Sequence, residues 1–395
     1  MHRPIGSASS ALLGLAVLLA ASAAPAAPAG ETDARAEVAD LIALASGGVS
    51  DSHDGPSPTT LARRILERKE KEVRAILEDA WKRAGTPGTV ASAQQNGIHH
   101  VARYLWSVDP PAQAAPDKIS FGGVHGAIHE IGGIVLVRPG GTGERGKVMG
   151  ERGWDRDDEP RTAFAALVKG GKWRKPPRFD PKAAFKALDG DAASKWNESE
   201  AASFHIGLGE ACGADAGSRP LLLKRFEDAP GDARLAAAVG RIGTPEAAAV
   251  LRGRIGPLAR RVGEGKDAAL PLLTAVCKGV ARSDPAAFLE EAAKLGGAGE
   301  RACLRAVGFR LACTALLDRH ARAPDAAGKR QAVLDTVTLV LQAYFFREFP
   351  TAADMPRLVR AWTESLDSGD AELAEWVDRG AYGLFHVGFR DGGAN

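Results

Sequence analysis

The sequence predicts a mainly α-helical protein, a right-handed α-solenoid of helical hairpins with an irregular insert rich in Gly and Pro. Three observations lead to this prediction. Residues 232–255 have the pattern of two short helices folded back on each other, a proline signature recurs about every 40 residues, and alanine is abundant. An α/α toroid or an irregular helical bundle would give the same local pattern, so both remain alternatives.

The stretch DARLAAAVGRIGTPEAAAVLRGRI defines the predicted hairpin. Apolar residues of its first helix recur at i, i+3, i+4 and i+7, which places Leu235, Ala238, Val239 and Ile242 on one face. Gly243 ends this helix, Thr244 can cap the next one with its hydroxyl, and Pro245 suits the first helical position. The second apolar stripe is Ala247, Val250, Leu251 and Ile255. Neither helix can bury its stripe alone, so the hairpin requires neighbours of its own kind.

The start of the second helix recurs along the chain. Asp284-Pro285 repeats Thr244-Pro245 after 40 residues, and Ala323-Pro324 repeats it after 39 more, although alanine is a poor cap. An earlier hairpin is predicted around Pro220 and a later one from Pro350 onward. A period of about 40 residues with two helices per unit is typical of HEAT and armadillo solenoids.

Three segments carry a resemblance to a known family. AVGRIGTPEAAAVLRGRI, LGEACGADAGSRPLLLKRF and VCKGVARSDPAAFLEEAAKL resemble HEAT repeats, including the short kind seen in bacterial proteins. The resemblance covers residues 198–390, within a predicted repeat domain at 182–395. It implies a surface that binds other macromolecules, because such solenoids mostly serve as binding proteins. We therefore expect a non-enzymatic binding or scaffold protein whose partner is a protein or a cell-envelope polymer.

The first 29 residues predict export. His2 and Arg3 give a cationic start, an apolar run covers 11–24, and Ala27-Pro28-Ala29 supplies the small residues that a signal peptidase recognises. We expect a signal peptide at 1–29 and a periplasmic or extracellular mature protein. No later stretch reaches 18 uninterrupted apolar residues, so no transmembrane segment is expected in the mature chain.

Composition narrows the class of partner. The formal net charge is +2, with 25% charged and 45% hydrophobic residues, which is ordinary for a folded globular chain. A charge this small gives no reason to expect a nucleic acid or a membrane surface as partner. The oligomeric state is left open by the sequence.

Four cysteines are present, Cys212, Cys277, Cys303 and Cys313. An even number of cysteines in an exported protein raises the question of disulfides. Cys303 and Cys313 are too far apart to pair if they lie on one continuous helix, whereas Cys277 and Cys303 can join neighbouring units. The favoured interpretation is that all four are free thiols acting as small core residues.

The first half of the chain divides into a helical region and the insert. Residues 30–107 predict helices, one opening at Ser57 and reaching about Arg83, and another over 90–106. From 108 to 181 glycine and proline become dense and helical periodicity fades. Within this insert the β-branched run 134–137 predicts a strand.

The insert also contains the candidate metal ligands, because His125 and His129 are four residues apart and Glu130 follows directly. Four-residue spacing places both histidines on one face, and imidazole with carboxylate suits zinc or copper. His99 and His100 lie nearby in sequence. The alternative function is therefore a metal-dependent hydrolase with a site in 99–130. No known metalloprotease motif is matched, so surface or core histidines are the competing interpretation.

Two other motifs in the insert give weaker evidence for a function. Residues 141–148 resemble a phosphate-binding loop, but Val148 replaces the required hydroxyl residue and no long helix can follow. An acidic run at 154–159 precedes a basic run with aromatics at 169–179, which suits either an anionic polymer or mutual pairing of the two runs. Because Gly-x-Ser-x-Gly and Ser-x-x-Lys motifs are missing, no catalytic or cofactor-binding residue is predicted.

Overall fold

The computed structural model describes residues 33–50, 53–84, 89–106, 127–139, 171–343, 350 and 353–391. These residues are mainly helical, as the sequence predicts. The chain separates into two compact units, one formed by Ala29–Leu251 and the other containing Arg252–Asn395. We call these the N-terminal unit and the C-terminal unit. The predicted segment limits at 107/108 and 181/182 stay predictions.

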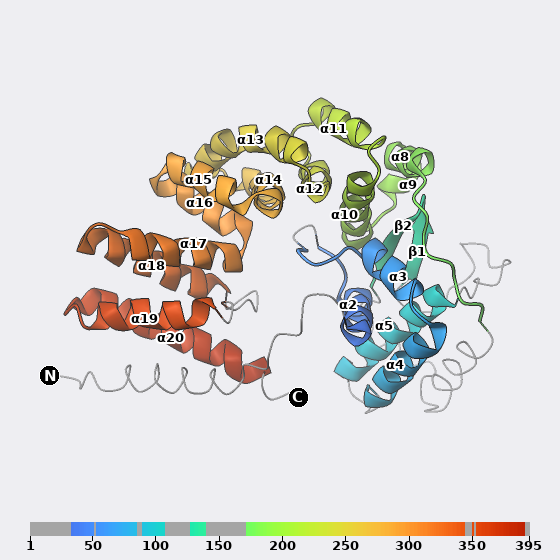
Figure 1. Cartoon of the computed structure of the whole chain (residues 1–395), viewed down its shortest axis with the longest axis horizontal. Helices are drawn as coiled ribbons and strands as arrows, with labels where there is room; N and C mark the ends of the chain where they lie inside the picture. Colours follow the sequence, from blue (N-terminus) through green and yellow to red (C-terminus); the bar gives the residue numbers. More distant parts are fainter. Residues whose placement is uncertain are drawn as a thin grey trace. The chain divides into compact units, whose positions relative to one another are not determined.

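The described residues of the N-terminal unit form helices and a β-hairpin (Figure 1). Its elements are α2 (Ala34–Gly47), α3 (Pro58–Leu66), α4 (Glu70–Arg83), α5 (Thr89–Leu105), β1 (Ala127–Ile131), β2 (Ile134–Arg138), α8 (Pro181–Asp189), α9 (Asp191–Ser194), α10 (Glu198–Ala214), α11 (Arg219–Asp228) and α12 (Ala233–Arg241). Helix α13 (Pro245–Gly263) begins in this unit. The elements of the C-terminal unit are η1 (Asp267–Ala269), α14 (Leu270–Ser283), α15 (Pro285–Leu295), α16 (Gly297–Val307), α17 (Phe309–Arg322), α18 (Ala326–Ala343), α19 (Asp354–Leu366) and α20 (Ala371–Asp391).

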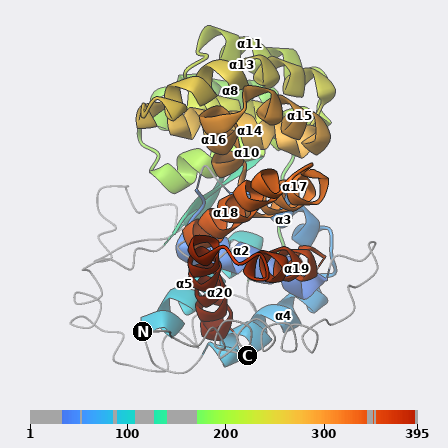
Figure 2. The same cartoon turned by 90° about the vertical axis from the view of Figure 1, so that its left-hand side faces the viewer.

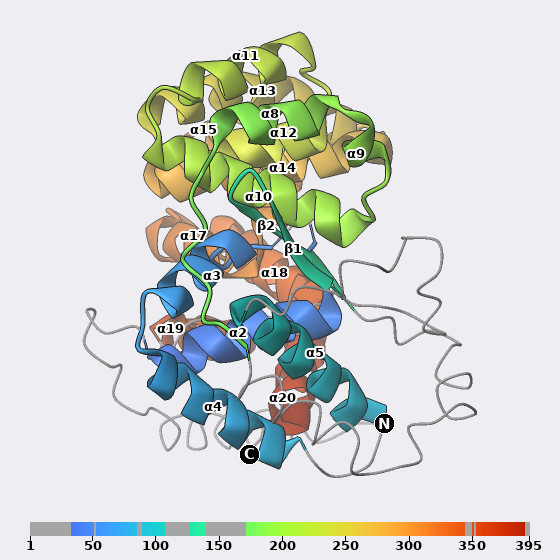
Figure 3. The ribbon, with the colours of Figure 1, turned by 90° about the vertical axis from the view of Figure 1, so that its right-hand side faces the viewer.

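The core of the N-terminal unit lies among α2–α5 and the hairpin. It buries large side chains from every one of these helices, including Leu41, Leu61, Leu77 and Leu105, together with Trp106 directly after α5. Val135 and Val137 of β2 join the same apolar cluster. Packing against this core fixes the hairpin between α10 on one side and α2 and α3 on the other (Figure 3).

The hairpin turns at Gly132 and Gly133, which have φ values of +58° and +78°. Both values lie in the left-handed region that glycine adopts at low cost, as a two-residue hairpin turn requires. A Cβ on Gly133 would also lie 2.2 Å from the Arg178 carbonyl oxygen. The chain after the insert therefore crosses directly over the turn, where the Asp180 N–H donates to the Gly132 oxygen.

Side-chain hydroxyls close the outer edge of β2. The register pairs Ile131 with Ile134 beside the turn, so the backbone groups of Val135 and Val137 point away from β1. The Val135 N–H donates to Thr59 Oγ1 at 2.9 Å, and the Val137 N–H donates to Ser203 Oγ at 3.1 Å. Ser199 Oγ donates to the Val137 oxygen at 2.9 Å. Side chains of α3 and α10 thus supply hydrogen bonds to β2 along the edge where a third strand would otherwise pair.

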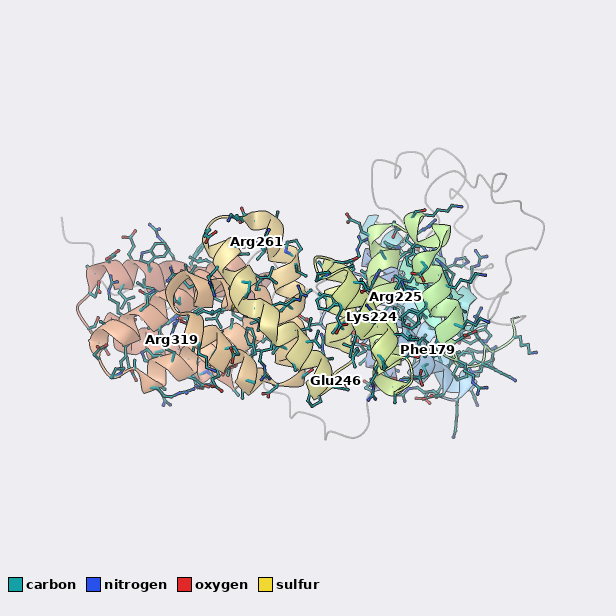
Figure 4. The ribbon with its side chains drawn as sticks, turned by 90° about the horizontal axis from the view of Figure 1, so that it is seen from above. Phe179, Lys224, Arg225, Glu246, Arg261 and Arg319 are labelled. Atoms are coloured by element: carbon teal, nitrogen blue, oxygen red, sulfur yellow. The ribbon has the colours of Figure 1, made fainter. Side chains whose placement is uncertain are left out.

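Helix α11 is tied back to α8 by one arginine. Arg225 forms an ion pair with Asp189, and its guanidinium carbon lies 5.6 Å from the centre of the Phe185 ring (Figure 4). A planar cation of this kind can hold a carboxylate and an aromatic face together. The contact fixes the position of α8 after the insert.

The C-terminal unit packs in chain order. Among α14–α20, all extensive helix contacts join helices one or two places apart along the chain. Helices α18 and α20, for example, lie side by side with α19 next to both (Figure 2). Trp362 of α19 is fully buried, and its indole N–H donates to Thr336 Oγ1 of α18 at 2.9 Å.

Several predicted helix starts are confirmed. Pro245 and Pro285 are the first residues of α13 and α15, and Pro220 is the second residue of α11. Thr244 and Asp284 cap the helices that follow them, accepting hydrogen bonds from the N–H groups of Ala247 and Ala287. Helix α13 is longer than predicted and continues to Gly263 with Pro257 inside it.

The predicted register is wrong at Pro324. One helix, α14, separates α13 from α15, but two helices, α16 and α17, separate α15 from α18. Pro324 also precedes α18 by two residues, and Asp325 caps that helix by accepting from the Gly328 N–H. Glycines with positive φ at 296 and 308 cut this stretch into three short helices, so an equal spacing in sequence does not mark an equivalent position.

The single helix predicted from Ser57 to Arg83 is also wrong. Ser57 does cap a helix, but the chain breaks at 67–69 and restarts as α4. Arg68 leaves the helical path and donates to the buried carboxylate of Glu37 at 2.8 and 2.9 Å. A tertiary ion pair overrides a continuous helical periodicity here.

Some predictions fall outside the described residues, namely the signal peptide at 1–29, the phosphate-loop resemblance at 141–148 and the acidic run at 154–159. Within the described helices, none has both the length and the apolar character needed to cross a bilayer. The strand predicted at 134–137 is confirmed as β2.

Candidate functional site

The candidate metal ligands do not converge as a group. His125 lies outside the described residues, while His129 and Glu130 are neighbours on β1. Successive side chains of a strand point to opposite faces, so the side chains of His129 and Glu130 lie in different environments. Across the described part of the chain, no group of three His, Cys, Asp or Glu side chains has the arrangement of a metal site.

Glu130 faces α5 and the segment that follows the insert. Its Oε2 accepts from Arg174 Nη1 at 3.2 Å and from the Tyr104 hydroxyl at 3.3 Å. The Arg174 guanidinium carbon lies 4.6 Å from the centre of the Tyr104 ring, and Arg174 Nε donates to the Tyr104 carbonyl oxygen. Burial raises the pKa of Tyr104, so the phenol stays protonated and donates. Glu130 therefore joins three segments of the fold, namely β1, α5 and the segment that follows the insert.

The predicted basic run takes part in the same packing. Trp173 lies 4.8 Å from Trp106, ring centre to ring centre, in an edge-to-face arrangement. The Trp106 indole in turn donates to Glu70 Oε1 at 3.0 Å. Arg174 pairs with Glu130, so part of the basic run, for which an anionic polymer was one of the two interpretations, anchors the chain to the core.

His129 faces a buried carboxylate that the sequence did not suggest. Its Nε2 lies 3.7 Å from Oε1 of Glu200, a residue of α10 whose side chain has no exposed area. Oε2 of Glu200 accepts from Arg138 Nη2 at 2.8 Å and from the Asn197 N–H at 3.0 Å. Oε1 has no hydrogen-bond partner among the described residues. We call His129, Arg138 and Glu200 the carboxylate site.

The charges of the carboxylate site are set by burial and by the arginine. Burial lowers the pKa of His129, Arg138 lowers it further, and Glu200 raises it in part. The imidazole is therefore neutral at pH 7 and has one lone pair to offer. A neutral imidazole and an ionised carboxylate oxygen 3.7 Å apart can together accept a proton donor or a cation. His129 is 39% exposed, so solvent reaches the site from its side of β1.

Substitutions at the carboxylate site should move the pKa of His129 in opposite directions. Glu200→Gln removes the charge that raises this pKa, so the value should fall, while Arg138→Gln removes a charge that lowers it, so the value should rise. NMR titration of the His129 ring measures both shifts. Glu130→Gln is the matched control and should leave the titration of His129 unchanged; equal shifts in all three variants would contradict the assigned geometry.

The other two histidines of the predicted region lie on α5. His99 and His100 have ring centres 5.9 Å apart, and among the described residues neither belongs to a group of three side chains that could hold a metal ion. Burial lowers the pKa of His99 to about 4, assisted by the charge of Arg103. This residue contributes a pH-dependent term to stability and no chemistry of its own.

Acid should destabilise the fold through His99. The unfolded chain takes up a proton near pH 6.5 and the folded chain only near pH 4, so the unfolded state binds more protons between these values. The stability present above pH 6.5 should fall as the pH drops towards 4, by about 2–3 kcal/mol from this group. Urea unfolding at several pH values measures the loss. His99→Gln should flatten this dependence and His100→Gln should not; a flat wild-type profile would contradict the assignment.

A second polar cluster joins α3, α10 and α12 around Glu210. The carboxylate accepts from the hydroxyls of Ser57 and Thr60 at 2.5 and 2.6 Å and from Arg241 Nη1 at 2.9 Å. Arg241, only 5% exposed, also donates to the backbone oxygens of His53 and Gly55. The polar atoms of this cluster hydrogen-bond to one another and to the backbone. The cluster therefore fixes the loop before α3, and we assign it a structural role.

Sequence reasoning missed Glu200, Arg138 and the first strand. Gly132-Gly133 between apolar residues is a hairpin signal that would have placed His129 on a strand opposite Leu136. Asn197 followed three residues later by Glu200 is a capping box, which the structure contains. No local signal brings α10 beside β2, because that contact depends on tertiary packing.

Comparisons of the chain with protein-family models, curated proteins and solved structures found no match.

Proposed function

We propose that the chain is an exported, non-enzymatic binding or scaffold protein. In this proposal its C-terminal helices form a right-handed solenoid of HEAT-like hairpins, whose surface binds a protein or a cell-envelope partner. The observation that supports it most directly is the chain-ordered packing of α14–α20. A solenoid is built in this quasi-one-dimensional way, because each unit contacts only its neighbours.

Interhelical arginines support the same proposal. Arg319 of α17 donates to Glu300 of α16 at 3.0 Å and to Asp335 of α18 at 2.5 Å (Figure 4). Arg330 of α18 similarly reaches Asp370 and Glu372 at the start of α20, both at 2.7 Å. Each guanidinium thus ties helices that are near in sequence. A surface held in this way loses little side-chain freedom on binding, which suits a scaffold.

The exposed face of α16 suggests the charge of a partner. Arg301 and Arg305 are exposed, lie one helical turn apart, and have no carboxylate partner among the described residues. Like charges at i and i+4 slightly destabilise a helix, and an acidic group placed between them would relieve that repulsion. We propose that acidic groups of the partner contact this face.

Crosslinking tests where the partner binds. The mature chain, immobilised and incubated with a cell-envelope extract, should yield a partner whose crosslinks map to α14–α20. With the purified partner, the double variant Arg301→Glu/Arg305→Glu should weaken binding at least tenfold. Arg379→Glu is a matched control, because Arg379 is also exposed but pairs with Glu375 on its own helix. Crosslinks confined to the N-terminal unit would refute the proposed surface.

The carboxylate site supports a second candidate function, a metal-dependent hydrolase. The observation in its favour is the position of His129 Nε2 beside the unpartnered Oε1 of Glu200, two ligand types that zinc accepts. Zinc analysis of the purified mature protein tests it. Stoichiometric zinc that is lost in His129→Ala and Glu200→Gln but retained in Glu130→Gln would favour the hydrolase. Metal-free protein after purification in zinc-containing buffer would remove it.

A further inference from the structure

Two of the four cysteines meet in the C-terminal unit. Cys277 of α14 and Cys303 of α16 are both fully buried, and their thiols are hydrogen-bonded to each other. Helices α14 and α16 pack extensively on one another, so the pair lies inside a helix interface. Cys212 belongs to the N-terminal unit, and Cys313 is a buried thiol of α17 whose pKa is raised to about 12, mainly by burial and further by the charge of Asp354. The structure holds all four side chains as free thiols.

We infer that Cys277 and Cys303 form a disulfide when the chain folds in an oxidising compartment, covalently joining α14 to α16. The two thiols are within hydrogen-bonding reach of each other across the packed α14–α16 interface, and a disulfide requires the sulfurs to approach from there to about 2.0 Å. The inference uses the export part of the proposed function, since disulfides persist in the periplasm and outside the cell. It does not depend on the identity of any partner.

The chemistry is thiol–disulfide exchange with an external disulfide, either oxidised glutathione or the disulfide form of a thiol oxidoreductase. The thiolate of one cysteine attacks a sulfur of the external disulfide and releases a thiolate, which leaves a mixed disulfide on the protein. The second cysteine then loses its proton, attacks the protein sulfur of the mixed disulfide and expels the other thiolate. In total the two protein thiols lose two electrons and two protons, and one external disulfide becomes two thiols.

In the packed interface, burial raises the pKa of Cys277, and the hydrogen bond from Cys277 lowers the pKa of Cys303. Both effects belong to the folded chain, so before the helices pack either thiol can attack the oxidant first. Because neither sulfur is exposed in the folded chain, the oxidant must act before α14 and α16 close on each other. The bond should form during folding and only slowly in the folded, reduced protein.

Refolding in the presence of a defined oxidant tests the inference. The full mature chain is unfolded under reducing conditions and refolded either in a glutathione redox buffer or in excess dithiothreitol, then quenched with an alkylating agent in denaturant. In the glutathione sample we expect a peptide joining Cys277 to Cys303, with Cys212 and Cys313 alkylated. The melting temperature should be about 5–10 °C higher than in the dithiothreitol sample, because the crosslink restricts the unfolded chain.

Two variants make the result specific. Cys277→Ser should abolish both the linked peptide and the rise in melting temperature. The double variant Cys212→Ala/Cys313→Ala retains the pair and should show both, so it tests the inference even if Cys277→Ser folds poorly. Absence of the linked peptide in the wild-type and double-variant samples, or linkage of a different pair, would overturn the inference. A bond that forms in glutathione but is absent from protein isolated from cells would instead count against export.

Discussion

Replacing Glu210 by alanine is expected to lower the free energy of unfolding by about 3–5 kcal/mol, because it leaves the buried Arg241 guanidinium without its carboxylate. The same change deprives the Ser57 and Thr60 hydroxyls of their common acceptor. Urea unfolding of the mature protein measures the loss. Hydrogen exchange should show the largest gain in opening at the start of α3, where Ser57 is held against Glu210.

Two controls define what the Glu210 result means. Glu210→Gln keeps an acceptor for the hydroxyls but removes the charge. The free energy of unfolding of this variant should therefore lie between the values of Glu210→Ala and the wild type. Glu264→Ala removes a carboxylate whose ion pair with Lys266 is about 60% exposed on both sides, and it should leave the unfolding curve unchanged. If Glu210→Ala proved as mild as Glu264→Ala, the cluster would not stabilise the N-terminal unit.

Replacing Trp362 by alanine is expected to cost about 3–5 kcal/mol in the C-terminal unit, from lost apolar burial and the cavity left behind. The indole fills a site that is shaped for it: a Cβ on Gly380 would lie 2.8 Å from its ring. Thr336 would also lose its indole donor. Denaturant unfolding followed by far-ultraviolet circular dichroism measures the effect.

The response to Trp362→Ala also bears on the proposed solenoid. If α14–α20 stack as successive units, damage at α19 should loosen α18 and α20 and broaden the transition, because each unit depends on its neighbours. Trp376→Ala is the matched control, since that ring is only partly buried and lies beside the exposed Arg379. A sharp transition shifted equally in both variants would argue against a stacked arrangement.

Local signals in the sequence were sufficient to predict where many helices begin. They were insufficient to predict which helix starts occupy equivalent positions along the chain. Thr244 and Asp284 are short polar residues before a proline, and each caps a helix through contacts within its own turn. The break before α4 and the three short helices between Pro285 and Pro324 are different cases. The first depends on Glu37, far away in sequence, and the second on glycines with positive φ that the proline spacing concealed.

The candidate site could be predicted only in part for a similar reason. The alternation of a strand separates His129 from Glu130, and this was hidden until β1 was recognised as a strand. The carboxylate that His129 does face belongs to α10 and is placed there by serine hydroxyls that reach the β2 backbone. Such long-range contacts leave no periodic trace in the sequence.

The closed edge of β2 has a consequence for the order of folding. Ile134–Val137 is an uncharged run of four apolar, mostly β-branched residues, the type of segment that recruits identical strands from other chains into aggregates. Among the described residues, Thr59, Ser199 and Ser203 hydrogen-bond to this edge, and they lie on helices that come from before and after the insert. Until α3 and α10 dock, the edge is open to another chain. We therefore expect loss of these hydroxyls to lower the yield of soluble protein during refolding more than it lowers the stability of protein that has already folded.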